Sequence, residues 1–205
     1  MSDKDALLIV DVQNDFCPGG SLAVPSGDRV AEVMSEYARA FEAAELPVYA
    51  SRDWHPPETR HFKEYGGPWP THCVQGTRGA EFHDALRLPP ATEVVSKGQD
   101  WEGGSYSAFL AVDDEGHPLE ESLRVRGVRR LFVGGLATDY CVRASVLDAR
   151  AKGFDVVLLT DAIAGIDVNA GDVERAVAEM KQAGASTTTI DELPALLGPA
   201  AGRKA

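Results

Sequence analysis

The chain has 205 residues, and its 32 acidic and 20 basic residues give a formal net charge of −12. This charge argues against nucleic acid or an anionic membrane surface as a partner, because both are bound by clustered lysine and arginine. The length suits one α/β domain over residues 1–205, with a core at about 6–197 and a flexible tail at 198–205. Neither a signal peptide nor a membrane span is recognisable, so we expect a cytoplasmic protein.

Apolar runs typical of buried strands alternate with stretches of helical spacing along the chain. We predict strands at 6–12, 46–51, 92–97, 129–135, 154–163 and 186–190. We predict helices at 28–44, 118–126, 138–152 and 172–183. Strands this apolar need cover on both faces, so the pattern predicts an α/β fold with a doubly wound parallel sheet. Two segments, 53–83 and 98–117, are too long to be simple connections, which favours a functional role for them.

Polar and reactive residues follow the ends of four predicted strands. Asp11 ends the first strand, Asp53 and His55 follow the second, Lys97 ends the third, and Cys141 comes shortly after the fourth. Ligands of parallel α/β sheets bind beyond the carboxyl ends of the strands. We therefore expect these side chains to share one edge of the sheet.

Cys141 is a candidate nucleophile because it lies at the start of a predicted helix, in the stretch GGLATDYCVRAS. With Thr138 or Asp139 as the N-cap, the free N–H groups and positive end of that helix would lower the thiol pKa and bind a developing oxyanion. The alternative is a cysteine that fills the core, which is how we interpret Cys17 and Cys73. Three widely spaced cysteines predict no disulfide framework.

Asp11 and Lys97 are the candidate partners of Cys141. Each follows an apolar strand, where a charge is costly unless it is paired. One interpretation is a purely structural ion pair between the two. The other adds Cys141 to the pair, so that Lys97 stabilises the thiolate and Asp11 carries the proton.

The first long loop is a candidate site for one divalent transition metal. The motif DWH places Asp53 and His55 on the same side of an extended segment, and His61 and His72 follow in the same loop. Mixed oxygen and nitrogen ligands suit zinc, iron or manganese. The alternative is a set of scattered surface histidines, because the spacing is not that of a closed structural zinc site.

Five motifs in chain order carry a resemblance to a known family. They are DVQNDFCPGGSLAV, RDWHPPETRHF, PWPTHCVQGT, SKG…YSAF and GLATDYCVRASVLDA. Together, over about residues 7–190, they resemble the nicotinamidases, also called pyrazinamidases, of the isochorismatase-like cysteine hydrolase superfamily. The resemblance implies a three-layer fold with a six-stranded, doubly wound parallel sheet.

The resemblance also implies a catalytic triad of Cys141, Asp11 and Lys97. It implies a cis peptide bond between Leu136 and Ala137. This bond would turn the Ala137 N–H beside that of Cys141 and complete an oxyanion hole from the two groups.

The metal and substrate sites are implied in the same way. The implied metal ligands are Asp53, His55 and His72, with His61 as a ligand that only some members use. The implied substrate-binding residues are Phe16, Trp69 and Tyr106, which match aromatic walls of the pocket, and Gln13, which falls near it.

The implied activity is metal-dependent hydrolysis of nicotinamide and pyrazinamide-like aromatic amides to the acid and ammonia, through a cysteine thioester, in NAD salvage. The metal would hold the ring nitrogen of the substrate, directly or through water. One alternative is another cysteine amidohydrolase of the superfamily, acting on a carbamoyl or ureido substrate. A second is a catalytically silent metal-binding protein on this fold. The choice between monomer and homo-oligomer stays open.

Overall fold

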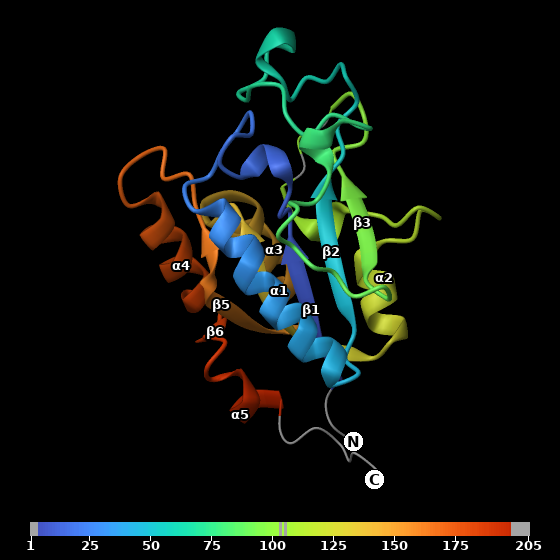
Figure 1. Ribbon diagram of the computed structural model, residues 1–205, viewed down its shortest axis with the longest axis vertical. Helices are drawn as coiled ribbons and strands as arrows, with labels where there is room; N and C mark the ends of the chain where they lie inside the picture. The colour runs from blue at the N-terminus through green and yellow to red at the C-terminus, as the bar shows by residue number, and fades with distance from the viewer. Residues whose placement is uncertain (1–3, 103, 105, 198–205) are drawn as a thin grey trace.

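The computed structural model describes residues 4–102, 104 and 106–197, so the predicted flexible tail lies outside the described part of the chain. Six parallel strands form one sheet in the order β3-β2-β1-β4-β5-β6 (Figure 1). They are β1 (Lys4–Val10), β2 (Val48–Asp53), β3 (Glu93–Lys97), β4 (Val128–Leu136), β5 (Asp155–Ala164) and β6 (Ser186–Thr188). The predicted doubly wound parallel sheet is confirmed, and each predicted strand is present.

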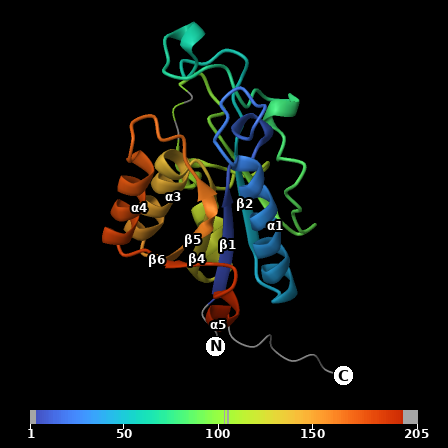
Figure 2. The same ribbon diagram turned by 60° about the vertical axis from the view of Figure 1, so that its left-hand side comes forward.

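Helices cover both faces of this sheet. They are α1 (Gly27–Ala43), α2 (Leu119–Val125), α3 (Arg143–Ala151), α4 (Asp172–Gln182) and α5 (Leu193–Leu197). Short 3-10 helices occupy Asn14–Phe16, Lys63–Tyr65, Arg78–Ala80 and Ala108–Leu110, and a π-helical turn occupies Thr138–Val142. Figure 2 shows the sheet nearly edge-on, with α1 on one side and α3 and α4 on the other. Within the described residues, no helix is long and apolar enough to cross a membrane.

The strand β1 runs through the centre of the sheet and packs on both layers of helices. Leu7 and Ile9 belong to the apolar cluster that includes α1, whereas Leu8 and Val10 belong to the cluster that includes α2, α3 and α4. All four side chains are completely buried. Each buried leucine or isoleucine stabilises the fold by roughly 1.5–3 kcal/mol. The uninterrupted apolar run of β1 is therefore explained by burial on both of its faces.

The sheet has its topological switch point between β1 and β4. From β1 the chain proceeds to β2 and β3 on one side, and from β4 it proceeds to β5 and β6 on the other. Much of the long segment between β2 and β3, over residues 54–80, lies above the carboxyl edge of the sheet, at the top of Figure 1. A crevice at such a switch point is the usual ligand site of a doubly wound fold.

Two consecutive glycines let neighbouring elements approach this switch point closely. A Cβ on Gly134 would lie 2.7 Å from the Sδ atom of Met34 in α1. Gly135 has a φ of +126°, and a Cβ there would lie 2.0 Å from the carbonyl oxygen of Val10 in β1. Packing therefore requires glycine at 135, whereas a Cβ at 134 would first displace the flexible end of Met34.

Replacing Gly135 by alanine is expected to lower the free energy of unfolding by more than about 3 kcal/mol, because the strained φ and the backbone clash with β1 add together. Gly116 is a matched control, since its φ is +89° but nothing lies within 4 Å of a Cβ there. We expect Gly116→Ala to cost only about 1–2 kcal/mol. Equal losses for the two variants in urea-induced unfolding would contradict this account.

Candidate active site

The carboxylate of Asp11 and the ammonium of Lys97 meet beyond the ends of β1 and β3. Lys97 Nζ lies 2.8 Å from Asp11 Oδ2, and both side chains are completely buried. The hydroxyl of Ser51, in the intervening strand β2, donates to Asp11 Oδ1 at 2.7 Å. The predicted pairing of Asp11 with Lys97 is thus observed, and Ser51 is a third partner that the sequence analysis missed. The available signal was a serine at the end of the predicted strand 46–51, level with the other polar strand ends.

Lys97 contacts two further groups. Its ammonium donates to Asp53 Oδ1, and it lies 3.6 Å from the sulfur of Cys141. Acceptor atoms of Asp11, Asp53 and Cys141 all lie within 4.8 Å of one another. The structure therefore brings the three predicted catalytic residues together, and it joins Asp53 to them through Lys97.

The electrostatics of this cluster favour a neutral thiol on Cys141. Burial raises the pKa of Cys141 well above its usual value, and the negative charges of Asp11 and Asp53 oppose the stabilising charge of Lys97. Burial also raises the pKa of Asp11, although Lys97 acts against it. Burial acts against the charge of Lys97, but the two carboxylates hold its pKa well above the usual value. We expected the helix terminus to favour a thiolate on Cys141, and the structure does not support this. The ammonium of Lys97 already faces the carboxylates of Asp11 and Asp53, whose negative charges disfavour a thiolate beside them.

The turn that carries Cys141 differs from the predicted start of a regular α-helix. Residues 138–142 form a π-helical turn, Ala137 is its N-cap, and no side chain caps it. Asp139 instead accepts hydrogen bonds from the N–H groups of Ile166 (3.0 Å) and Asp167 (2.9 Å). The predicted N-cap role of Thr138 or Asp139 is therefore wrong. Asp139 ties the turn to the segment after β5.

The peptide bond between Leu136 and Ala137 is cis, as the resemblance implies. The Ala137 carbonyl accepts hydrogen bonds from the N–H groups of Tyr140 and Val142, both at 3.1 Å. The residues on either side of Cys141 are thereby both hydrogen-bonded to Ala137. An oxyanion-binding role for the N–H groups of Ala137 and Cys141 stays a prediction.

Three buried histidines of the first long loop converge beside this cluster. One ring nitrogen from each of His55, His61 and His72 lies within 4.8 Å of the others. His55 Nδ1 contacts the Gly98 carbonyl at 3.0 Å, and His72 Nδ1 contacts the Pro70 carbonyl at 2.7 Å. Because a carbonyl only accepts, each Nδ1 carries a proton, so the neutral form of each imidazole presents the lone pair of Nε2. The interpretation as scattered surface histidines is excluded.

Asp53 connects the histidines with the catalytic cluster. Its Oδ2 lies 3.7 Å from His55 Nε2 and 3.9 Å from His72 Nε2, while its Oδ1 accepts from Lys97. Burial acts to raise the pKa of Asp53, but the charge of Lys97 and the contact with His55 outweigh it, so the pKa is lowered. The Asp53 carboxylate is therefore ionised, and it faces Lys97 with one oxygen and the histidines with the other.

Gln13 is completely buried and supports Asp53. Gln13 Oε1 accepts from the Asp53 N–H at 2.8 Å, and Gln13 Nε2 donates to the carbonyls of Asp53 (2.8 Å) and Ala80 (2.9 Å). All of these partners are backbone groups. These contacts are those of a positioning residue for Asp53, and the substrate-binding role of Gln13 stays a prediction.

Aromatic side chains surround the histidines. Trp69 Nε1 donates to the hydroxyl of Tyr106 at 2.9 Å, and Phe16 lies 5.5 Å from His72 between ring centroids. The ring of Tyr140 lies 5.0 Å from Trp69 and 5.7 Å from Tyr106. The predicted aromatic residues are thus brought together, although their contact with a substrate stays a prediction. Tyr140 was missed, and its place directly before the candidate nucleophile was the signal.

The other two cysteines pack in the core. Cys17 and Cys73 are buried within the apolar cluster on the α1 side of the sheet and form no disulfide. Burial raises the pKa of Cys17 to about 12 and that of Cys73 well above its usual value. The interpretation of both as core residues is confirmed.

Gln13→Leu is expected to lower the free energy of unfolding by about 2–4 kcal/mol, because the Asp53 N–H and carbonyl would be left buried without partners. We also expect slower turnover, since the Asp53 carboxylate loses its support. Urea-induced unfolding and a steady-state assay measure the two effects. Unchanged stability and unchanged turnover would contradict the positioning role.

The histidine cluster makes the stability of the metal-free protein depend on pH. Burial, followed by the nearby His55 and His72, lowers the pKa of His61 from 6.5 to about 4. The unfolded chain therefore binds more protons between these two pH values, so stability falls as the pH is lowered through this range. We expect His61→Asn to reduce the slope of stability against pH by up to about 1.4 kcal/mol per pH unit. Identical slopes in urea-induced unfolding from pH 4 to 7 would contradict this.

Comparisons with known proteins agree with the fold. Residues 5–192 match the model of the Isochorismatase domain family. A nicotinamidase/pyrazinamidase of Mycobacterium tuberculosis is 44% identical over 182 residues, which cover 87% of this chain and 95% of that protein. A nicotinamidase of Escherichia coli is 38% identical over 204 residues, covering 90% and 94%.

A solved structure is similar over most of the chain. The crystal structure of a pyrazinamidase of Pyrococcus horikoshii in complex with zinc superposes with a TM-score of 0.83 at 45% sequence identity, covering 91% of this chain and 99% of that one. The chain belongs to the isochorismatase family.

Proposed function

We propose that this protein is a nicotinamidase, an amidohydrolase that converts nicotinamide and related aromatic carboxamides to the corresponding acid and ammonia. The observation that carries the proposal is the cluster of Asp11, Lys97 and Cys141 beside three buried histidines, in a chain similar to nicotinamidases over most of its length. The small-molecule substrate would lie between the aromatic side chains above this cluster.

The first half of the reaction would form a thioester on Cys141. The sulfur attacks the amide carbon while the thiol proton passes to Asp11, whose raised pKa suits it to accept a proton and release it again. The N–H groups of Ala137 and Cys141 would bind the oxyanion, at roughly 3–4 kcal/mol per donor. Asp11 then protonates the leaving nitrogen, which departs as ammonia.

The second half would restore the enzyme. A water molecule attacks the thioester carbon, the acid is released, and the sulfur of Cys141 regains a proton through Asp11. Lys97 keeps its charge throughout, because two carboxylates hold its pKa well above its usual value. Its role is to hold Asp11 in place and to offset the negative charge that develops on sulfur.

The residues beside the cluster fit a divalent metal, and zinc is the ion we propose. The buried Nε2 of His55 has no hydrogen-bond partner within the described part of the chain. The free lone pairs of the histidines and the ionised Asp53 form a donor set typical of zinc, with iron and manganese as alternatives. His55, His61, His72 and Asp53 would hold the ion, which when bound would supply a Lewis acid that orients the ring nitrogen of the substrate.

The two alternative functions are disfavoured by particular residues. A catalytically silent protein would have no need for a fully buried lysine that contacts two carboxylates and a cysteine sulfur. A carbamoyl or ureido substrate gives no role to the aromatic side chains of Trp69, Tyr106 and Tyr140 around the histidines.

Cys141→Ala is expected to reduce the release of ammonia from nicotinamide by at least about 10³-fold, because the covalent route is lost. Cys17→Ala is the matched control, since it removes another buried thiol at a distance from Lys97, and it should keep the activity as long as it folds. Ammonia release by the purified proteins is measured at equal metal content. Wild-type rates in Cys141→Ala would refute the proposal.

A further inference from the structure

Thr59 is a completely buried polar residue that the reaction scheme leaves without a role. It lies in the first long loop, two residues before His61. Its hydroxyl donates to the carbonyl of Trp101 at 3.0 Å and accepts from the N–H of His61 at 3.2 Å. One hydroxyl thus joins the backbone of His61 to a segment about forty residues further along the chain.

The partner segment, residues 98–102, follows Lys97 directly and contacts the histidine loop at several points. The Gly98 carbonyl accepts from His55 Nδ1 at 3.0 Å, and the Trp101 carbonyl also accepts from the Arg60 N–H at 2.9 Å. The ring of Trp101 packs against Tyr65 at 5.6 Å between centroids. Segment 98–102 therefore supports two of the three histidines, His55 through its ring and His61 through Thr59 and Arg60.

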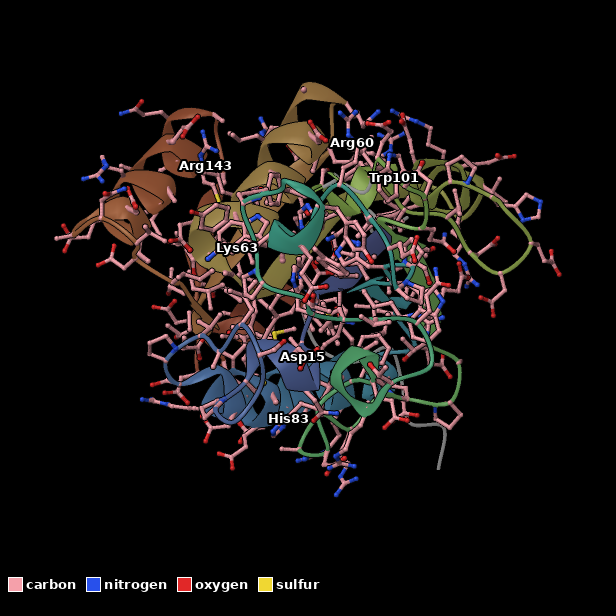
Figure 3. The ribbon with its side chains drawn as sticks, turned by 90° about the horizontal axis from the view of Figure 1, so that it is seen from above. Asp15, Arg60, Lys63, His83, Trp101 and Arg143 are labelled. Atoms are coloured by element: carbon pink, nitrogen blue, oxygen red, sulfur yellow. The ribbon has the colours of Figure 1, made fainter. Side chains whose placement is uncertain are left out.

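Figure 3 looks down on this edge of the molecule. Arg60 and Trp101 are labelled next to one another there, as their hydrogen bond requires. Both side chains are exposed, Trp101 to 46%, whereas Thr59 and His61 are buried. The hydroxyl of Thr59 is consequently shielded from water, which strengthens its dependence on the two backbone partners.

His61 is the histidine that most needs such support. The rings of His55 and His72 are each fixed by a hydrogen bond from Nδ1 to a backbone carbonyl. The ring of His61 stacks on His55 at 4.7 Å and meets Tyr106 edge-on at 6.1 Å, between ring centroids. The placement of its backbone therefore decides where its ring nitrogens lie, and Thr59 and Arg60 are the residues that tie this backbone to segment 98–102.

We propose that the Thr59 hydroxyl is a positioning group for the metal site: by bridging the Trp101 carbonyl and the His61 N–H, it holds His61 at liganding distance from His55 and His72. The inference rests on the proposed metal site and deepens it. The hydroxyl at this position donates to one backbone group and accepts from the other. Valine has the same shape but neither capability.

The test is the affinity of the metal-free, full-length protein for Zn²⁺, measured by competition with a chromophoric chelator and without substrate. We expect Thr59→Val to weaken Zn²⁺ binding by about 10- to 100-fold, the usual effect of removing a group that orients a metal ligand. Thr59→Ser keeps the hydroxyl and should bind like the wild type. Thr160→Val is the matched control, because it removes a hydroxyl that donates to a backbone carbonyl in β6 (3.2 Å), and it should leave the affinity unchanged.

A second pair of variants, made in the protein that carries His61→Ala, distinguishes the positioning of His61 from a general loss of structure. In His61→Ala, which has no third histidine to hold, adding Thr59→Val should not weaken Zn²⁺ binding further. Circular dichroism of the metal-free variants reports their folding, and Thr59→Ala carries the same test if the valine variant does not fold.

The outcomes are distinguishable. Equal Zn²⁺ affinity in wild type and Thr59→Val would overturn this inference alone, and so would an equal loss in the His61→Ala background. Failure of the wild-type protein to bind Zn²⁺ would overturn the proposed metal site together with the inference.

Discussion

The buried ammonium of Lys97 is the interaction on which the rest of the site depends. It contacts Asp11, Asp53 and the sulfur of Cys141, and removing it would leave two carboxylates facing one another without water. Breaking a buried ion pair on one side typically costs about 3–5 kcal/mol. The ammonium is also what couples the two functional halves, since Asp53 offers one oxygen to Lys97 and the other to the histidines. Lys97 thus contacts both the carboxylate proposed to transfer the proton, Asp11, and the one proposed to bind the metal, Asp53.

The sheet delivers these groups to one point because of its switch between β1 and β4. Asp11 follows the strand on one side of the switch, and the turn carrying Cys141 follows the strand on the other. Gly135 lets the two strands approach closely at that place. The nearby backbone groups are then held by side chains that take no direct part in the chemistry: Gln13 holds Asp53, and Asp139 holds the turn of Cys141.

Much of this arrangement is predictable from the sequence, because strand ends in a parallel sheet share one edge. That rule places Asp11, Lys97 and Cys141 together, and the DWH motif indicates the metal loop. The rule does not predict hydrogen bonds between a side chain and a backbone group far away in the sequence. Gln13 and Thr59 look like ordinary polar residues until the carbonyls they bind, 40 and 42 residues away, are known. The direction of the Cys141 pKa was also missed, since helix polarity is local whereas the opposing carboxylates arrive from other strands.

The central claim is that Lys97 is already neutralised by Asp11 and Asp53, so that Cys141 rests as a thiol and passes its proton to Asp11 only during attack. The most direct measurement is the ultraviolet absorbance of the thiolate near 240 nm, titrated from pH 5 to 10 in the metal-free protein and in Cys141→Ser. The account predicts no difference between the two proteins at neutral pH. A thiolate signal present at pH 7 in the wild type and absent from Cys141→Ser would contradict it.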